Sequence, residues 1–132
     1  MTHFGRLIGL VPFLLAGATQ AGPLAYMCTV THVYTLTDSA TIEVSGFEKE
    51  MKGSSFSVSR VTGEIIGEVV PTLLAKSTRV VNKGTKENSF KAVADFGEQF
   101  QLLEVQEFKP GEAKPFIASS MGGAGIVTGT CK

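Results

Sequence analysis

Apolar and polar side chains alternate with a period of two through most of the chain that follows the first 21 residues. In Ser54–Val61, Phe56 and Val58 fall on one side and the intervening serines fall on the other. This period is typical of a β-strand with one buried face. The alternation and the turn signals between the runs predict these strand segments: Ala25–Leu36, Thr41–Phe47, Ser54–Val61, Glu64–Val70, Ser77–Asn82, Ser89–Phe96, Gln99–Phe108, Ala113–Met121 and Ala124–Cys131.

Turn residues separate the segments. Thr62-Gly63 interrupts two β-rich runs and predicts a hairpin, because glycine accepts a positive φ. Pro110-Gly111 is the pair that a type II turn prefers. Pro71–Lys76 is the one place where we expect a short helical turn, with the proline at its start. Since most connections are short, the sequence favours a meander of adjacent antiparallel strands.

The two cysteines restrict this meander. Cys28 lies near the start of the first segment and Cys131 at the end of the last. In an up-and-down meander these two points share an end only if the strand number is even, and a disulfide requires Cα atoms within about 7 Å. Ser77–Asn82 is the weakest of the predicted strands. We therefore expect an all-β fold, a small antiparallel meander of about eight strands closed into a barrel or flattened barrel, with its first and last strands joined by the disulfide.

The alternation also assigns side chains to faces. In the first segment it places His32 on the face of Cys28 and Val30, and Val33 on the opposite face. Closed barrels of this size are usually filled by side chains, but some hold one small apolar ligand. Six phenylalanines are candidates for the core or for the lining of such a cavity: Phe56, Phe90, Phe96, Phe100, Phe108 and Phe116.

Residues 1–21 have the layout of a secretory signal peptide, with a basic residue, the apolar run Leu7–Ala16 and then small residues. The apolar run is about half of the roughly 20 residues that span a bilayer as a helix. We expect cleavage after Ala21, or after Ala18, and a periplasmic or secreted product. Residues 22–132 then form a single all-β domain.

Export and charge exclude several function classes. An even number of cysteines in an exported chain predicts a disulfide. Cleavage leaves 11 basic residues against 12 acidic ones. This balance argues against a nucleic-acid ligand and against a polybasic membrane anchor, both of which need clustered cations. No second apolar run is long enough to be a transmembrane segment, and the aromatic girdles of an outer-membrane barrel are absent from the sequence.

The sequence predicts no catalytic, cofactor or metal site. His32 is the only histidine that remains after cleavage, and no Gly-x-Ser-x-Gly motif accompanies it. One histidine and two paired cysteines cannot supply the four ligands of a zinc site. The glycine-rich run Met121–Gly125 precedes a strand, whereas a phosphate cradle needs a helix N-terminus. A third functional hypothesis is a hydrolase that uses His32.

Tyr26-Met27-Cys28 near the start of the domain and a cysteine near its end resemble the layout of the periplasmic inhibitors of C-type lysozyme. The resemblance implies a small eight-stranded barrel with a disulfide. The inhibitory segment of that family is a Ser-Gly loop followed by an aromatic-rich strand. Ser45-Gly46-Phe47 matches it poorly, and the chain has no tryptophan. No inhibitory residue is therefore carried over, because a shared fold does not establish a function.

These observations favour an exported, non-enzymatic β domain that binds a protein or a cell-envelope component through its surface. The alternatives are a small barrel that carries an apolar ligand and, by analogy of fold, a lysozyme-inhibitor-like protein. The sequence identifies neither the partner nor the oligomeric state.

Overall fold

The computed structural model describes residues 24–121 and 125–132, so the expected signal peptide lies outside the described residues. The described chain forms one antiparallel sheet and a short helix, α1 (Glu48–Met51), which confirms the all-β class. The strands are β1 (Ala25–Leu36), β2 (Ile42–Val44), β3 (Ser55–Ser59), β4 (Ile65–Gly67), β5 (Ser77–Lys83), β6 (Phe90–Asp95), β7 (Phe100–Val105), β8 (Lys114–Met121) and β9 (Gly125–Cys131).

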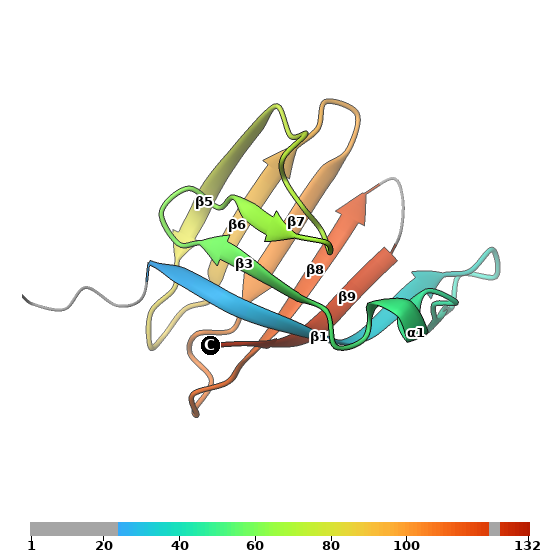
Figure 1. Ribbon diagram of the computed structural model, residues 1–132, viewed down its shortest axis with the longest axis horizontal. Helices are drawn as coiled ribbons and strands as arrows, with labels where there is room; N and C mark the ends of the chain where they lie inside the picture. Colours follow the sequence, from blue (N-terminus) through green and yellow to red (C-terminus); the bar gives the residue numbers. More distant parts are fainter. Residues whose placement is uncertain (1–23, 122–124) are drawn as a thin grey trace, which may run out of the picture.

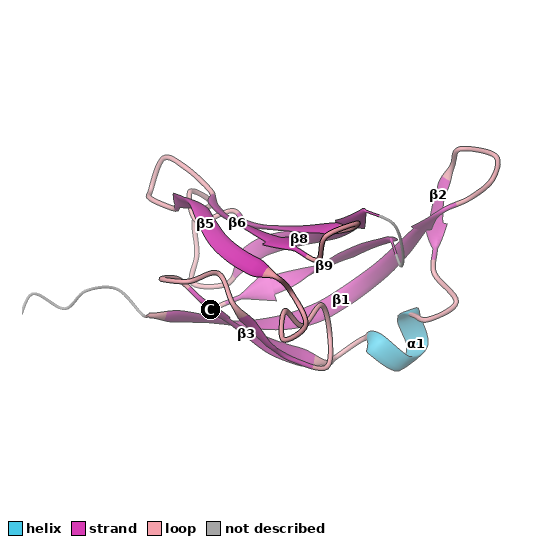
Figure 2. Cartoon of the chain, turned by 90° about the horizontal axis from the view of Figure 1, so that it is seen from above, coloured by secondary structure: helices cyan, strands magenta, loops and turns pink. Residues whose placement is uncertain are grey.

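The sheet curls into a half-barrel (Figures 1 and 2). Its strand order is β4-β3-β1-β9-β8-β7-β6-β5, and β2 pairs with β1 outside this path. From β5 to β9 each strand lies beside the next one in sequence, as the predicted meander requires. The chain departs from a simple meander at β1, which lies between β3 and β9.

The two ends of the sheet, β4 and β5, do not pair with each other within the described residues. β4 has three residues, and its outer edge is occupied by a neighbouring loop. The Ile65 N–H donates to Thr72 Oγ1 at 2.8 Å, and the Thr72 N–H donates to the Ile65 carbonyl at 3.2 Å. Because Thr72 takes the place of a partner strand, the half-barrel stays open between β4 and β5.

Cys28 and Cys131 form the predicted disulfide between the first and last strands. The two residues face each other directly on β1 and β9, with Cα atoms 4.0 Å apart. Next to them, Met27 and Lys132 exchange two backbone hydrogen bonds of 2.9 Å each. The disulfide thus occupies a non-hydrogen-bonded pair, the position where antiparallel strands bring side chains closest together.

A β-bulge in β1 changes which side chains face the core. Val30 pairs with Gly129 and His32 pairs with Thr128, so Thr31 is an extra residue opposite β9. The alternation of side chains shifts by one at this point. Val33 is buried and His32 is exposed. The predicted faces of these two residues were therefore wrong.

The core lies between the two halves of the curled sheet. Phe56 of β3 packs edge-on against Phe116 of β8, and Tyr26 of β1 packs edge-on against Phe90 of β6, each with ring centroids 5.2 Å apart. These pairs connect strands that are distant in the sheet. The other buried apolar residues are Cys28, Val30, Val33, Val58, Ile65, Val69, Ala92, Ala94, Leu103, Val105, Ala118, Val127 and Cys131.

Two local predictions need correction, and the weakest predicted strand is confirmed. Pro71–Lys76 forms no helix but a turn, in which the Ala75 N–H donates to the Thr72 carbonyl. Ser77–Asn82, the weakest of the predicted strands, is confirmed within the seven-residue β5. The strand predicted over Thr41–Phe47 is reduced to the three residues of β2, because the chain turns at Ser45 to enter α1.

Candidate functional site

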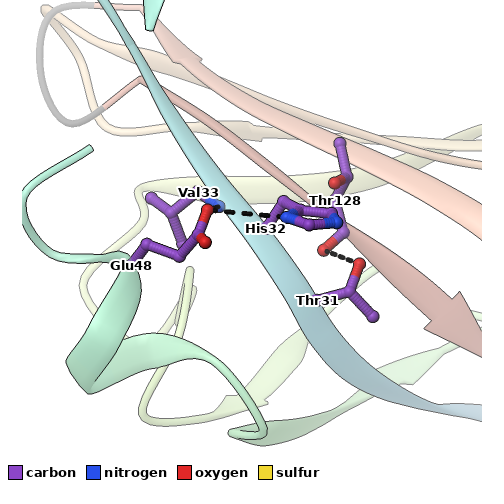
Figure 3. Close-up of polar contacts among 5 residues, drawn as sticks. All are labelled: Thr31, His32, Val33, Glu48 and Thr128. Carbon is purple, nitrogen blue, oxygen red and sulfur yellow. Dashed lines mark hydrogen bonds and ion pairs between the residues drawn. The ribbon is translucent and has the colours of Figure 1, made fainter. Parts of the chain in front are cut away.

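His32 lies on the exposed side of the β1 bulge, beside α1 (Figure 3). Its Nδ1 is 3.6 Å from Glu48 Oε2, and the two form an ion pair when the imidazole is protonated. The same Oε2 accepts a hydrogen bond from the Val33 N–H at 3.1 Å. The hydroxyl of Thr31 donates to the Thr128 carbonyl at 3.3 Å. These contacts join the bulge to the start of α1 and to β9.

Glu48 completes the backbone hydrogen bonding of β1 where this strand changes partners. β3 pairs with the first part of β1 and β2 pairs with the last part. Between them, the Val33 carbonyl accepts from the Ser45 N–H, and the Val33 N–H donates to Glu48. A carboxylate that accepts from a backbone N–H makes a charge-assisted bond, which is stronger than a neutral one. The role of Glu48 that these contacts support is structural.

The His32–Glu48 pair has only part of what nucleophilic catalysis needs. A carboxylate that orients a histidine is present, but a catalytic triad also requires a hydroxyl or thiol bonded to the imidazole. Within the described residues, His32 makes no hydrogen bond to a hydroxyl, and the Thr31 hydroxyl is bonded to Thr128. The described ranges 24–121 and 125–132 also contain no group of three or more side chains suited to hold a metal ion.

Replacing Glu48 with alanine is expected to lower the free energy of unfolding by about 1–2 kcal/mol, because the Val33 N–H loses its acceptor. Urea unfolding followed by far-UV circular dichroism measures the loss, and hydrogen exchange of the Val33 amide shows where it occurs. Glu50→Ala is the matched control, since Glu50 is exposed in the same helix. Equal effects of the two variants would contradict the structural role of Glu48.

The structure divides the six candidate phenylalanines into three groups. Phe56, Phe90 and Phe116 are buried in the core, as expected. Phe96 is half-buried. Phe100 and Phe108 are 46% and 40% exposed, so the prediction that they face the core or a cavity was wrong.

Gln101 is buried in place of Phe100. Its side-chain amide donates to the Val70 carbonyl at 2.7 Å, and Leu103 and Val105 are buried on the same side of β7. This hydrogen bond satisfies the inward-facing side-chain amide, since a buried polar group needs a hydrogen-bond partner.

Tyr26 connects the core to the open end of the half-barrel, by which we mean the side left open between β4 and β5. Its hydroxyl donates to Glu107 Oε2 at 2.6 Å, and the guanidinium carbon of Arg60 is 4.6 Å from its ring centroid. Burial and the hydrogen bond to Glu107 both raise the pKa of Tyr26 above its ordinary value, so the phenol stays neutral. Stacking on this ring holds Arg60 over the open end.

Two surface clefts lie at this open end. The smaller one, of about 530 Å³, is lined by residues 64–67, 71–73 and 75–78. The larger one, of about 1070 Å³, is lined by residues 24, 60–62, 64, 77–81, 83 and 84, and we call it the β4–β5 cleft. None of the six candidate phenylalanines lines either cleft.

One wall of the β4–β5 cleft is the free edge of β5. This strand pairs with β6 on one side, and within the described residues no strand pairs with its other side. Strands alternate their backbone N–H and C=O groups between two edges, so an unpaired edge is a template for another strand. The strand has no fully buried residue. Its sequence, STRVVNK, has polar residues on both faces around Val80 and Val81, and this was the signal of an edge strand that our sequence analysis missed.

A second exposed surface is the β1–β2 hairpin, which extends away from the half-barrel beside α1 (Figure 2). Leu36 faces Ile42 and Tyr34 faces Val44 across the two strands. Leu36, Ile42 and Val44 are exposed, as is Phe47 in the connection to α1. The hairpin therefore presents apolar side chains together with two acidic residues, Glu43 of β2 and Asp38 of the turn, and no cation that would select an acidic partner lies between β1 and β2 in the described chain.

No helix in residues 24–121 and 125–132 has the length and apolar character needed to cross a bilayer. The disulfide is consistent with an extracellular or periplasmic location. Comparisons with protein-family models, with curated proteins and with solved structures found no match to this chain.

Proposed function

We propose that residues 22–132 form an exported, non-enzymatic binding domain, which binds an extended polypeptide by adding it as a strand to the free edge of β5. The observation that carries this proposal is the unpaired edge of a seven-residue strand next to a cleft of about 1070 Å³. In strand addition, main-chain hydrogen bonds supply affinity, and neighbouring pockets select alternate side chains of the ligand.

The dimensions of β5 fit this mode of binding. Seven residues of antiparallel strand extend over about 23 Å, enough to pair with a segment of similar length. Gly63, which has a positive φ of 80° as the predicted hairpin requires, lies against β5, where an added Cβ atom would be 3.3 Å from the Arg79 carbonyl oxygen. The opposite wall of the cleft is formed by residues 60–62 and 64 of the same connection between β3 and β4. This wall would contact the side chains of the bound segment on one face.

Export is the second part of the proposal. A disulfide is retained in oxidising compartments such as the periplasm and the cell exterior. Residues 1–21 carry the layout of a signal peptide, with cleavage expected after Ala21 or Ala18. The partner would then be a periplasmic, envelope or extracellular polypeptide.

Selection of a phage library of linear twelve-residue peptides on the purified domain tests the binding mode. We expect the selected peptides to slow hydrogen exchange at backbone amides of β5. We also expect that N-methylation of alternate residues of a selected peptide abolishes binding, whereas N-methylation of the residues between them does not. An added strand uses only alternate amides to pair with the protein edge.

Failure to select any linear peptide would overturn the proposed function. So would selected peptides that protect the amides of β2 and leave those of β5 unchanged. If a peptide is held by its side chains alone, the loss of binding will not alternate along the methylated positions. That result would also contradict strand addition.

The two alternatives have separate tests. An apolar-ligand carrier requires saturable binding of an uncharged fluorescent fatty-acid ester, and the smaller cleft, which includes Ile65, Ile66 and Leu73, is the place that would hold it. A lysozyme-inhibitor-like protein requires that the purified domain slow the lysis of bacterial cell walls by C-type lysozyme. Neither result is expected if the domain binds extended polypeptides.

A further inference from the structure

Three cationic side chains line the β4–β5 cleft. Arg60 directly follows β3, and Arg79 and Lys83 belong to β5, whose edge forms the cleft wall. Glu64 is the acidic residue that lines the same cleft. The chain as a whole has equal numbers of basic and acidic residues, so this excess of cations is local to the cleft.

These cations are not neutralised inside the fold. Among residues 24–121 and 125–132, the only ion pair within 4.0 Å joins His32 to Glu48, far from the cleft in the sheet. Arg60 contacts the face of the Tyr26 ring, which fixes the position of the guanidinium and leaves its N–H groups without a carboxylate. A guanidinium held by stacking loses less entropy when it binds a carboxylate.

We infer that the polypeptide bound along β5 is acidic, with carboxylate side chains that meet Arg60, Arg79 and Lys83. This inference rests on the proposed function, because the bound strand positions the carboxylates. Apolar side chains lie among the cations in the same cleft, namely Leu24, Val61 and Val81, each more than half exposed. The ligand class is therefore an extended segment in which carboxylates alternate with small apolar residues.

A second copy of this chain fits the cleft less well. Two β5 edges that paired with each other would bring the Arg79 and Lys83 side chains of both copies together, and like charges across strands are destabilising. Cations on an edge strand commonly prevent self-association of this kind. The same charges that disfavour another β5 favour an acidic strand.

The inference is tested with three synthetic decapeptides that share their valine and serine positions and carry glutamate, glutamine or lysine at three alternate positions. We expect the glutamate peptide to bind at least about tenfold more tightly than the glutamine peptide, which corresponds to roughly 1.4 kcal/mol. We expect the lysine peptide to show no binding. Raising the salt concentration is expected to remove most of the difference, because the cations are exposed to solvent.

The variant Arg79→Gln/Lys83→Gln is expected to bring the affinity for the glutamate peptide close to that for the glutamine peptide. Arg60 is left in place because it also packs on Tyr26. Lys49→Gln/Lys52→Gln is the matched control, since it removes the same charge from exposed residues in and next to α1. This control is expected to keep the wild-type preference.

Equal affinity for the glutamate and glutamine peptides would overturn the inference and leave strand addition supported. Absence of binding by all three, together with an unsuccessful library selection, would overturn the proposed function itself. Binding of oligo-dT or of vesicles containing phosphatidylglycerol, reduced by Arg79→Gln/Lys83→Gln while no peptide binds, would replace the acidic polypeptide with a phosphate-bearing ligand and overturn the inference.

Discussion

Replacing both Cys28 and Cys131 with alanine is expected to lower the free energy of unfolding by up to about 4.7 kcal/mol. The two residues are separated by 103 positions, so the disulfide closes a loop that includes almost the whole domain. The unfolded chain gains the entropy of this loop when the bond is removed. Domains of this size are stable by only about 5–15 kcal/mol, so the loss is a large share of the total.

Urea unfolding of the double variant and of the wild type, followed by far-UV circular dichroism, measures this loss. The wild type in excess dithiothreitol is the control and should match the double variant, whereas dithiothreitol should leave the variant unchanged. A loss below about 1 kcal/mol would show that the pairing of β1 with β9 holds the ends of the chain together without the disulfide.

Replacing Gly129 with alanine is expected to cost about 3 kcal/mol or more, the upper range for overpacking a well-filled core. Gly129 faces Val30 of β1 on one side and Phe116 of β8 on the other. A Cβ atom at this position would overlap the Thr29 carbonyl oxygen and come within 2.7 Å of Phe116 Cε1. The carbonyl belongs to the backbone of β1, so no change of rotamer relieves the overlap.

Gly46→Ala is the matched control for this experiment, because a Cβ atom at Gly46 has no heavy atom within 4 Å. We expect its free energy of unfolding to stay within about 0.5 kcal/mol of the wild type, as is usual for surface substitutions. Thermal unfolding of the two variants in the same buffer gives the comparison. If Gly129→Ala were as stable as Gly46→Ala, β1 and β9 would not approach each other as closely as the structure shows.

The double variant Cys28→Ala/Cys131→Ala and the variant Gly129→Ala both act on the contact between β1 and β9, which joins the two halves of the half-barrel. β3 and β4 are connected to the rest of the sheet only through β1 among the described strands. Weakening this contact should therefore also disturb the cleft at the open end, and peptide binding should be measured only on variants that remain folded.

Several features of the fold could be predicted from the sequence alone, because they depend on short-range patterns. The alternation of apolar and polar residues located the strands, and Thr62-Gly63 located a turn. The disulfide followed from two cysteines at the ends of a predicted antiparallel sheet, and it is confirmed at directly opposed positions. Each of these inferences needs only neighbouring residues or a simple rule of strand direction.

Other features were decided only by tertiary contacts. The bulge at Thr31 turns Val33 inward and His32 outward, and it lies where β1, paired with β9 on one edge, changes from β3 to β2 on the other. The side-chain amide of the buried Gln101 donates to the Val70 carbonyl, 31 residues away in sequence. The alternation of apolar and polar residues within one strand does not indicate which strands it pairs with or which distant groups its side chains contact.

The candidate site was also beyond the reach of local patterns. Arg60, Arg79 and Lys83 come from two strand regions that the sequence does not connect, and only the curl of the sheet brings them to one cleft. The sequence determined where strands form, since that depends on the side chains of each segment. The structure decided which strand edge remains free, since that depends on how long each neighbouring strand is and what covers it.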